Sequence, residues 1–246
     1  LDGSDWGGAN TGVSVDENGV LSGSKFMVPD AAQATWIAVV GSDAAGDAVV
    51  ALVAGSDVAV QAQASHALID LTKRASTLDF AGVKAQRVLS GDKVDSAIRD
   101  YLLIGALLTA AEAVGSTSAC LAGIVDYLKT RKQFGKLIGS FQALKHPTVD
   151  IYVGMEHSRS LVYHASSEID DGPLSTEAEV ACRMAKAKSS DTIQYAGDRS
   201  VQFHGGFGFT WECDSSLFIR RAAWSQQQFG DAMHHRKRLA PLLLDA

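Results

Sequence analysis

The sequence predicts an α+β protein, in which a β-barrel or β-sandwich domain is followed by an antiparallel four-helix bundle. Two observations lead to this fold class. Up to about residue 90, short segments rich in Val and Ala are separated by Gly, Asp, Ser and Asn, as strands and tight turns require. After about residue 93, apolar residues recur at spacings of three and four, which is the period of a helix. We therefore expect a β domain over residues 1–91 and a helical domain over residues 92–246.

The β domain is predicted from four segments. Each is short and bounded by turn-forming residues, and several alternate between apolar and polar positions. Others are nearly continuous apolar runs, which fits a sandwich or a small barrel buried on one side. The four segments are GVLSGSKFMV (19–28), WIAVVG (36–41), DAVVALVAG (47–55) and DVAVQAQA (57–64).

The helical domain is predicted to contain four helices. A second helix is expected to open at Pro147, because proline is tolerated in a first turn. A third follows the break at 170–179, where Thr176 and Glu179 form a capping-box pattern. The last is expected from about residue 212 to 241, which completes a series typical of an antiparallel bundle. The first helix is long, and its apolar face is predicted from Leu107, Ala111, Val114, Ser118, Leu121, Val125 and Leu128.

Composition and charge exclude several classes of function. The net charge of −6 disfavours nucleic acid as a main partner, because phosphate contacts need clustered Lys and Arg. The basic cluster His234–Arg238 is local, and we interpret it as cations in the last turn of a helix. Cys120, Cys182 and Cys213 are widely spaced without a CxxC, which disfavours a disulfide framework or a zinc site and fits the reducing cytoplasm. No apolar run reaches the roughly 18 residues that cross a bilayer, so we expect no membrane partner.

Two motifs indicate a ligand site. RKQFGKLIGSFQ (131–142) presents Arg131 for a phosphate, Phe134 for stacking on a base and Gln142 for the base edge. A simple helix–turn–helix connection explains this segment at least as well. QFHGGFGFTWE (202–212) holds paired glycines that let backbone approach a ligand closely, and a helix is expected just after them. An interhelical turn is the alternative there, and a Rossmann fingerprint is excluded because no strand precedes the glycines.

Together these motifs, within CRMAKAKSSDTIQYAGDRSVQFHGGFGFTWE (182–212), resemble the acyl-CoA dehydrogenase family. SGSKFMVPDAAQATW (22–36) resembles that family's middle domain, and GSD (3–5) resembles the end of its T-E-P-x-x-G-S-D flavin loop. The resemblance covers essentially the whole chain. It implies a middle β domain followed by the C-terminal four-helix domain, with the family's N-terminal helical domain absent from this chain.

The resemblance also implies a cofactor and half of its binding site. In that family FAD accepts a hydride from Cβ of an acyl-CoA while a glutamate removes the α proton, and the flavin lies between subunits. This chain would then supply the adenosine and pyrophosphate contacts to FAD held by another subunit. Phe141 stands where some members carry a histidine. The half-site that the resemblance assigns consists of Arg131, Gln133, Phe134, Phe141, Gln142, Gln202, Gly205 and Gly206.

The catalytic side of the family's site does not carry over. An ungapped match places the family's glutamate at Phe229. The alternative position, on the first long helix, falls at Gly105, with the CoA-contacting arginine at Ala106. The flavin-packing Trp-x-Thr reads Met27-Val28-Pro29. Neither phenylalanine nor glycine can accept a proton, so no catalytic residue is expected in this chain.

These losses predict a non-catalytic subunit of a heteromeric, FAD-dependent acyl-CoA dehydrogenase. The pattern is similar to the glutamate-lacking subunit of actinobacterial heterotetrameric enzymes that act on steroid side-chain CoA thioesters. The expected partners are a catalytic subunit in an α2β2 heterotetramer, an acyl-CoA substrate, and an electron-transferring flavoprotein as acceptor. Two alternatives stay open: a self-sufficient homomeric dehydrogenase or oxidase with an unusual base such as Asp231, and a degenerate scaffold that holds no flavin.

Overall fold

The computed structural model of the chain describes residues 12–59, 64–65 and 68–244. They belong to two compact units, which divide after Tyr101. This division falls inside a long helix, beyond the domain boundary expected after residue 91. The GSD segment at 3–5, interpreted as the end of a flavin loop, lies outside the described residues.

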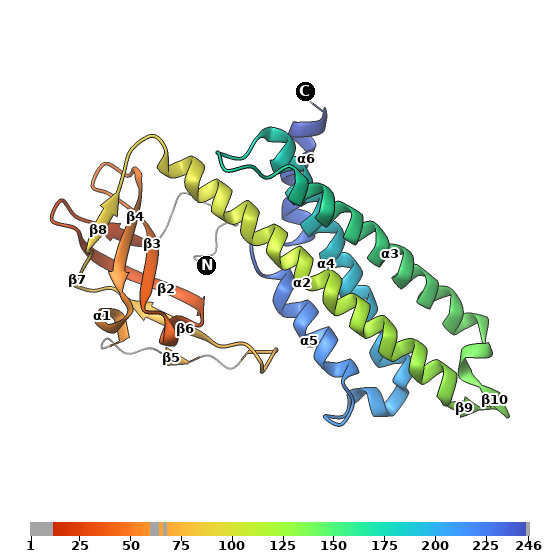
Figure 1. The fold of residues 1–246 in the computed structure, drawn as a ribbon. Coiled ribbons are helices and arrows are strands. Elements are labelled where there is room, and N and C mark those ends of the chain that lie inside the picture. The colour runs from red at the N-terminus through yellow and green to blue at the C-terminus, as the bar shows by residue number, and fades with distance from the viewer. Residues whose placement is uncertain (1–11, 60–63, 66–67, 245–246) are drawn as a thin grey trace. The chain divides into compact units, whose positions relative to one another are not determined.

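The first unit is built on an eight-stranded sheet of order β5-β6-β2-β1-β3-β4-β8, with β7 paired to β2 off this path (Figure 1). The predicted strands at 19–28, 36–41 and 47–55 are confirmed as β2, β3 and β4. Within the described residues the edge strands β5 and β8 do not pair with each other, so the sheet is open and the expectation of a closed barrel is wrong. The strands are β1 (Val13–Val15), β2 (Val20–Pro29), β3 (Trp36–Ser42), β4 (Ala48–Ala54), β5 (Ala64–Ser65), β6 (Ala75–Asp79), β7 (Val83–Lys84) and β8 (Arg87–Leu89).

The strand predicted over 57–64 is wrong at its start, because Gly55–Ala59 form the short helix α1. Gly55 donates its N–H to the carbonyl of Thr35 at 2.8 Å, and a Cβ on it would lie 1.8 Å from the carbonyl oxygen of Ala34. The chain therefore turns out of the sheet as soon as β4 ends. Val58 on α1 is fully buried and joins the apolar core of this unit.

The second unit is helical, and helix α4 packs against α3, α5 and α6. The α+β class is thus confirmed, but the four-helix bundle is not confirmed in detail. The single helix predicted over 212–241 is two helices, because Phe229 and Gly230 between them have φ angles of 55° and 98° and a right-handed helix requires negative φ. The helices are α2 (Val94–Thr130), α3 (Gln142–Ser167), α4 (Thr176–His204), α5 (Ser215–Gln226) and α6 (Ala232–Leu244), with short 3₁₀ turns η1 (Ala31–Gln33), η2 (Ile138–Ser140) and η3 (Gly205–Phe209).

The long helix α2 is confirmed, but its buried face is turned by about one residue from the predicted one. Ala111, expected on the apolar face, is exposed, whereas Ala110 and Ala113 are buried. The tertiary neighbours explain the difference: the buried positions of α2 share one apolar cluster with an alanine-rich face of α4, and this contact, not the local pattern, decides which residues are covered. The buried residues of α2 from position 103 onward include Leu103, Ala106, Leu107, Ala110, Ala113, Thr117, Cys120, Ile124 and Leu128.

Helix α2 is also the one helix among the described residues that is long and apolar enough to cross a membrane, with a mean hydropathy of 1.4 over its best window. The core helix of a protein that meets no membrane passes the same test. Because α2 contributes buried residues to three apolar clusters with α3, α4 and α5, we interpret it as a core helix.

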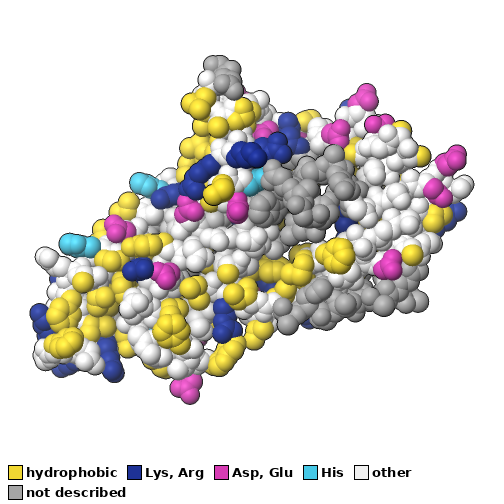
Figure 2. Space-filling view, turned by 180° about the vertical axis from the view of Figure 1, so that it is seen from behind, with side chains coloured by type: hydrophobic (Ala, Val, Ile, Leu, Met, Phe, Trp, Pro, Cys, Tyr) yellow, Lys and Arg dark blue, Asp and Glu magenta, His cyan; other side chains and the backbone are white. Residues whose placement is uncertain are grey.

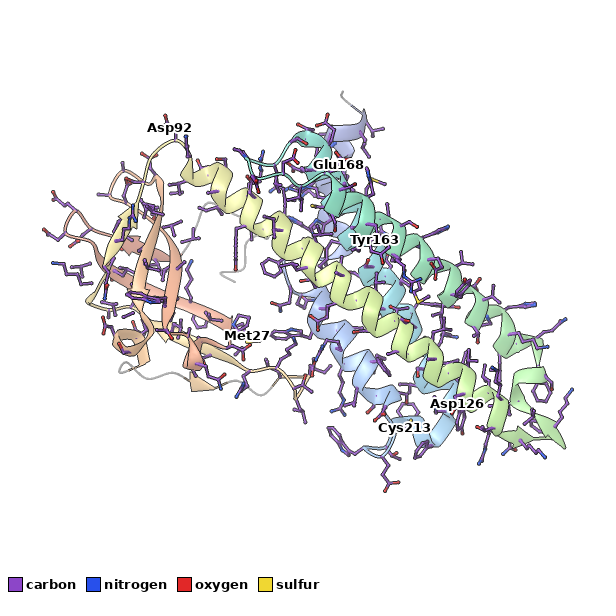
Figure 3. All side chains as sticks on the ribbon, in the orientation of Figure 1. Met27, Asp92, Asp126, Tyr163, Glu168 and Cys213 are labelled. Atoms are coloured by element: carbon purple, nitrogen blue, oxygen red, sulfur yellow. The ribbon has the colours of Figure 1, made fainter. Side chains whose placement is uncertain are left out.

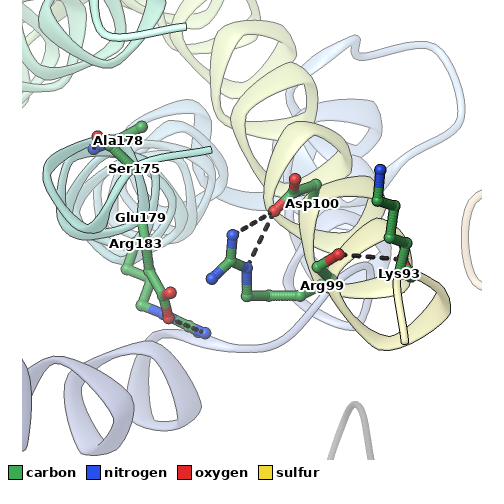
Figure 4. A network of polar contacts seen from close by, with 8 residues as sticks. Lys93, Arg99, Asp100, Ser175, Ala178, Glu179 and Arg183 are labelled. Atoms are coloured by element: carbon green, nitrogen blue, oxygen red, sulfur yellow. Dashed lines mark hydrogen bonds and ion pairs between the residues drawn. The ribbon is translucent and has the colours of Figure 1, made fainter. Parts of the chain in front are cut away.

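The N-terminus of α4 is capped one residue earlier than the capping-box pattern predicts. The hydroxyl of Ser175 accepts the backbone N–H of Ala178 at 3.1 Å, so Ser175 is the N-cap (Figure 4). Glu179 instead pairs with Arg183 one turn further along the same helix, at 2.7 Å. Together these contacts fix the start of the helix whose other end reaches the candidate site.

Candidate functional site

The segment from Arg131 to Gln142 forms a tight hairpin directly after α2. Strands β9 (Lys132–Gln133) and β10 (Lys136–Leu137) pair in antiparallel register. Phe134 and Gly135 at the tip have φ angles of 51° and 79°, the positive values that two-residue hairpin loops need. The side chain of Phe134 is 88% exposed. The hairpin therefore presents an aromatic ring to whatever binds here rather than to the core.

The paired glycines end a helix instead of preceding one. Gly205 has a φ of 61° and donates its N–H to the carbonyl of Gln202, which stops α4. The next α-helix begins only at Ser215, so the expected helix N-terminus beside the glycines is wrong. A Cβ on Gly205 or Gly206 would meet no atom within 4 Å, so the backbone of both faces open space.

A pocket of about 670 Å³ brings the hairpin and the glycine turn together. Figure 2 shows Lys, Arg and hydrophobic side chains gathered at the end of the helical unit that carries β9 and β10. The mixture suits a ligand with both a flat apolar part and an anionic part. The pocket is lined by Tyr127, Arg131, Gln133, Phe134, Ile138, Phe141, Leu144, Phe203, His204, Gly205, Gly206 and Phe207.

Aromatic pairs form two walls of this pocket. The rings of Tyr127 and His204 stack with centroids 4.1 Å apart. Phe134 and Phe141 meet edge to face at 6.0 Å, and the Lys136 ammonium lies 4.4 Å from the Phe141 ring centre. The arrangement provides flat surfaces for a heterocycle with cationic groups beside them.

Hydrogen bonds fix the orientation of the groups at the pocket's edge. The carbonyl of Arg131 accepts the N–H of Ile138 at 2.9 Å, which closes the hairpin at its base. His204 donates from Nδ1 to the carbonyl of Ser200 at 2.8 Å, which sets the plane of its ring and leaves Nε2 for other contacts. The pocket is therefore held by backbone contacts that do not depend on a ligand.

Six of the eight predicted half-site residues line this pocket; the exceptions are Gln142 and Gln202. Gln142 is the exposed first residue of α3, and Gln202 lies exposed in the last turn of α4. Sequence reasoning missed Tyr127 and His204. Tyr127 lies four residues before Arg131, a helical spacing that places two residues on one face, and His204 directly precedes the glycines.

The two positions where the family's glutamate was expected touch each other. A Cβ on Gly105 would lie 2.3 Å from the ring of Phe229, so this ring fills the space in which a residue-105 side chain would stand. These residues are far apart in sequence, and the fold brings them to one place. The carboxylate of Asp231 nearby accepts the N–H of His234 at 2.7 Å at the start of α6, and Glu112 forms an ion pair with Arg221.

A buried lysine and a buried histidine hold the loop that carries Phe229. Lys186 is fully buried, and burial lowers its pKa to about 8, while the nearby carboxylate of Asp231 opposes this shift. His235 is 2% exposed, and its Nε2 donates to the carbonyl of Phe229 at 3.0 Å. Burial, and secondarily the charge of Lys186, lowers the pKa of His235 to about 3, so the ring is neutral at physiological pH.

In the first unit, the segment that stands for the family's Trp-x-Thr lies toward the end of β2, where Figure 3 labels Met27. Met27 has a φ of 55°, and the pairing of β2 with β6 shifts register between Lys25 and Val28. Pro29 closes the strand and offers neither a hydroxyl nor an N–H.

Comparison with known proteins identifies the family. Residues 96–241 match the family model described as acyl-CoA dehydrogenase, C-terminal domain. The chain belongs to the acyl-CoA dehydrogenase family. The resemblance inferred from the motifs is thereby confirmed, and the helical unit is this family's C-terminal domain.

One relative is the acyl-CoA dehydrogenase IpdE2 of Mycolicibacterium smegmatis, which is 38% identical over 134 residues. The match covers 54% of this chain and 40% of that protein. The chain thus matches less than half the length of this acyl-CoA dehydrogenase.

Two solved structures, a two-protein complex and a steroid ACAD, share the fold. The match to the ChsE4-ChsE5 complex from Mycobacterium tuberculosis covers 100% of this chain and 65% of the matched chain, with a TM-score of 0.84 and 22% sequence identity. The match to the Tcur3481-Tcur3483 steroid ACAD covers 96% of this chain and 63% of the matched chain, with a TM-score of 0.83 and 24% sequence identity. Both matches span the sheet unit as well as the helical unit, so the acyl-CoA dehydrogenase fold extends over the described chain.

Proposed function

We propose that this chain is a non-catalytic subunit of a heteromeric, FAD-dependent acyl-CoA dehydrogenase. It contributes adenosine and pyrophosphate contacts to FAD that is held mainly by a partner subunit carrying the glutamate base. One observation carries the proposal: the hairpin and the glycine turn form one pocket, whereas Phe229 and Gly105, the two positions that the resemblance gives for the base, pack on each other.

The residues of the pocket fit the outer half of FAD. Arg131 and the open backbone of Gly205 and Gly206 would contact the pyrophosphate, since guanidinium and backbone N–H groups favour phosphate oxygens. Phe134 and Phe141 would flank the adenine. Gln133 lines the pocket, and Gln142 and Gln202 stand beside it for base-edge and ribose contacts. FAD, when bound, accepts the hydride that leaves Cβ of the acyl thioester.

No residue of this chain is proposed to remove the α proton. Asp231, the base of the homomeric alternative, is engaged in capping α6, and Glu112 is engaged with Arg221. A general base must reach its proton within hydrogen-bond distance, and the position opposite Gly105 holds an aromatic ring instead. The partner subunit therefore has to supply the carboxylate.

The wider assignment follows from similarity to the heteromeric relatives. We propose an α2β2 heterotetramer located in the cytoplasm, with an acyl-CoA substrate and an electron-transferring flavoprotein as acceptor. The likeness to the ChsE4-ChsE5 complex supports the heteromeric assembly, and the likeness to a steroid ACAD supports a steroid side-chain CoA thioester as the acyl substrate.

The test is the flavin-to-chain ratio measured by absorbance. The chain is purified alone and after co-expression with a glutamate-bearing homologue encoded beside it. We expect a colourless protein alone and one flavin per pair of unlike chains in the complex. One flavin per chain in the isolated protein, with turnover of an acyl-CoA, contradicts the proposal.

A charge variant then locates the contact. Arg131→Gln should weaken flavin retention by the complex, whereas Lys237→Gln, an exposed cation on α6 that does not line the pocket, should leave it unchanged. Equal retention in both variants shows that Arg131 does not contact the cofactor.

A further inference from the structure

The connection between α5 and α6, residues 227–231, is tied down by a single buried cation. The Lys186 ammonium donates to the carbonyl of Gly230 at 2.9 Å, to the carbonyl of Ser225 at 3.1 Å and to the hydroxyl of Ser190 at 3.0 Å. An ammonium group has three donors, so these contacts can use all of them. Lys186 therefore joins α4 both to the last turn of α5 and to the connection that follows it.

Phe229 is held within this connection in a conformation that phenylalanine rarely adopts. Its φ of 55° lies in the left-handed region, which costs free energy for a residue with a Cβ. The His235 ring donates to its carbonyl at 3.0 Å. Gly230 follows with a φ of 98°, and a Cβ there would lie 2.7 Å from the ring of His234. The surrounding contacts thus leave the backbone of Phe229 little freedom.

The ring of Phe229 occupies a space on the surface of α2 that is open only because residue 105 is a glycine and has no Cβ. A Cβ on Gly105 would come within 2.3 Å, 2.6 Å and 2.6 Å of three atoms of this ring. Gly105 is buried, and its carbonyl accepts the Thr109 hydroxyl at 2.8 Å within an unbroken helix. A glycine inside a helix is unfavourable relative to alanine, so its presence here is explained by the ring it admits.

We propose that Phe229 is a fixed plug which closes, in this chain, the position where a catalytic carboxylate would stand, and that Lys186 is the positioning residue that keeps it there. The meaning of the closed position rests on the proposed function. The packing of Phe229 against Gly105 and its dependence on Lys186 do not.

A double-mutant cycle on the full chain tests the plug. Gly105→Ala should lower the midpoint of thermal unfolding by roughly 3–10 °C when Phe229 is present, since overpacking a well-filled site is destabilising. With Phe229→Ala in place, the same change should leave the midpoint unchanged or raise it, because alanine favours helix. Gly115→Ala, whose added Cβ would meet nothing within 4 Å, is the matched control and should not depend on residue 229.

The role of Lys186 is tested by its effect on that coupling. Lys186→Met keeps the length of the side chain and removes its donors, so the ring should be released and the destabilisation by Gly105→Ala should fall by at least half. Ser190→Ala, which leaves the bonds to the carbonyls of Ser225 and Gly230 in place, should not reduce it. If Lys186→Met does not fold, Lys186→Leu, which also lacks donors, replaces it.

Two results overturn the inference. If Gly105→Ala destabilises the protein equally with and without Phe229, the ring does not act as a plug. If the Lys186 variant leaves the coupling between residues 105 and 229 undiminished, Lys186 does not position the ring. The flavin-to-chain ratio is measured separately, so failure of the plug and failure of the proposed function are distinguishable.

Discussion

His235 should make this protein sensitive to acid, and the size of the effect follows from its surroundings. The ring is 2% exposed, its Nε2 bonds to the carbonyl of Phe229, and Nδ1 is a buried atom without a hydrogen-bond partner. A proton on Nδ1 would therefore add a buried, unsatisfied charge, next to the cation of Lys186. These effects lower the pKa of His235 to about 3, against an ordinary value of 6.5.

The resulting stability is present above pH 6.5 and is lost as the pH falls toward 3, because the unfolded chain binds the proton first. At about 1.36 kcal/mol per pH unit, the gap between the two pKa values corresponds to roughly 5 kcal/mol of unfolding free energy. His235→Gln retains a donor for the carbonyl of Phe229 but does not titrate. It should cost stability at pH 7 and flatten the decline between pH 6.5 and 4.

Urea denaturation at pH 7, 6, 5 and 4 measures this decline directly. His157→Gln, on the exposed surface of α3, is the matched control and should follow the parent curve. If the His235→Gln protein loses stability with falling pH as steeply as the parent, His235 does not titrate as described and the account of the loop is refuted.

Three further predictions follow from single contacts. Ser175→Ala should lower the free energy of unfolding by about 1 kcal/mol, and Thr176→Ala should lower it clearly less. If urea denaturation shows the reverse order, Thr176 is the N-cap. Phe134→Ala should change stability by less than about 0.5 kcal/mol because the ring is 88% exposed, yet weaken flavin retention by the complex; unchanged retention would remove Phe134 from the half-site. The three cysteines are buried, and burial raises the pKa of Cys120 and Cys182 to about 11. A thiol reagent at pH 8 should therefore modify the cysteines only as fast as the chain unfolds, and rapid modification of the native protein would contradict their burial.

Local sequence pattern predicted the elements whose neighbours agree with it. β4 alternates buried and half-buried positions as its sequence suggests, and its strand was predicted within a residue at each end. The segment after it failed because Gly55 packs on the backbone of Ala34, a tertiary contact that no local pattern records. The last helix failed for a similar reason. Its periodicity continues through 227–231, but Phe229 and Gly230 are held at positive φ by contacts from α4 and α6.

The candidate site was predictable in its parts but not in its assembly. The hairpin and the glycine turn each have a sequence signature, and the fold joins them into one pocket. The contributions of Tyr127 and His204 could not be read locally, because the stacking of their rings depends on how the end of α2 meets the end of α4. The contact between Phe229 and Gly105 was also hidden, since sequence shows two separate losses and only the structure shows that they share one space.

That shared space bears on the proposed loss of the catalytic base. A lost glutamate with nothing in its place would leave a gap that one substitution could refill. Here the ring of Phe229 occupies the gap, Gly105 is shaped to it, and Lys186 and His235 fix the loop behind it. A carboxylate introduced at residue 229 would have a left-handed backbone conformation near the buried ammonium of Lys186. Ala106, at the position expected for the CoA-contacting arginine, carries no charge. The chain therefore has an aromatic ring packed on glycine at the position proposed for the base, and an open pocket where α2 and α4 end. Under the proposed function, an open pocket at one end and a filled position at the other are what a subunit that completes its partner's site requires.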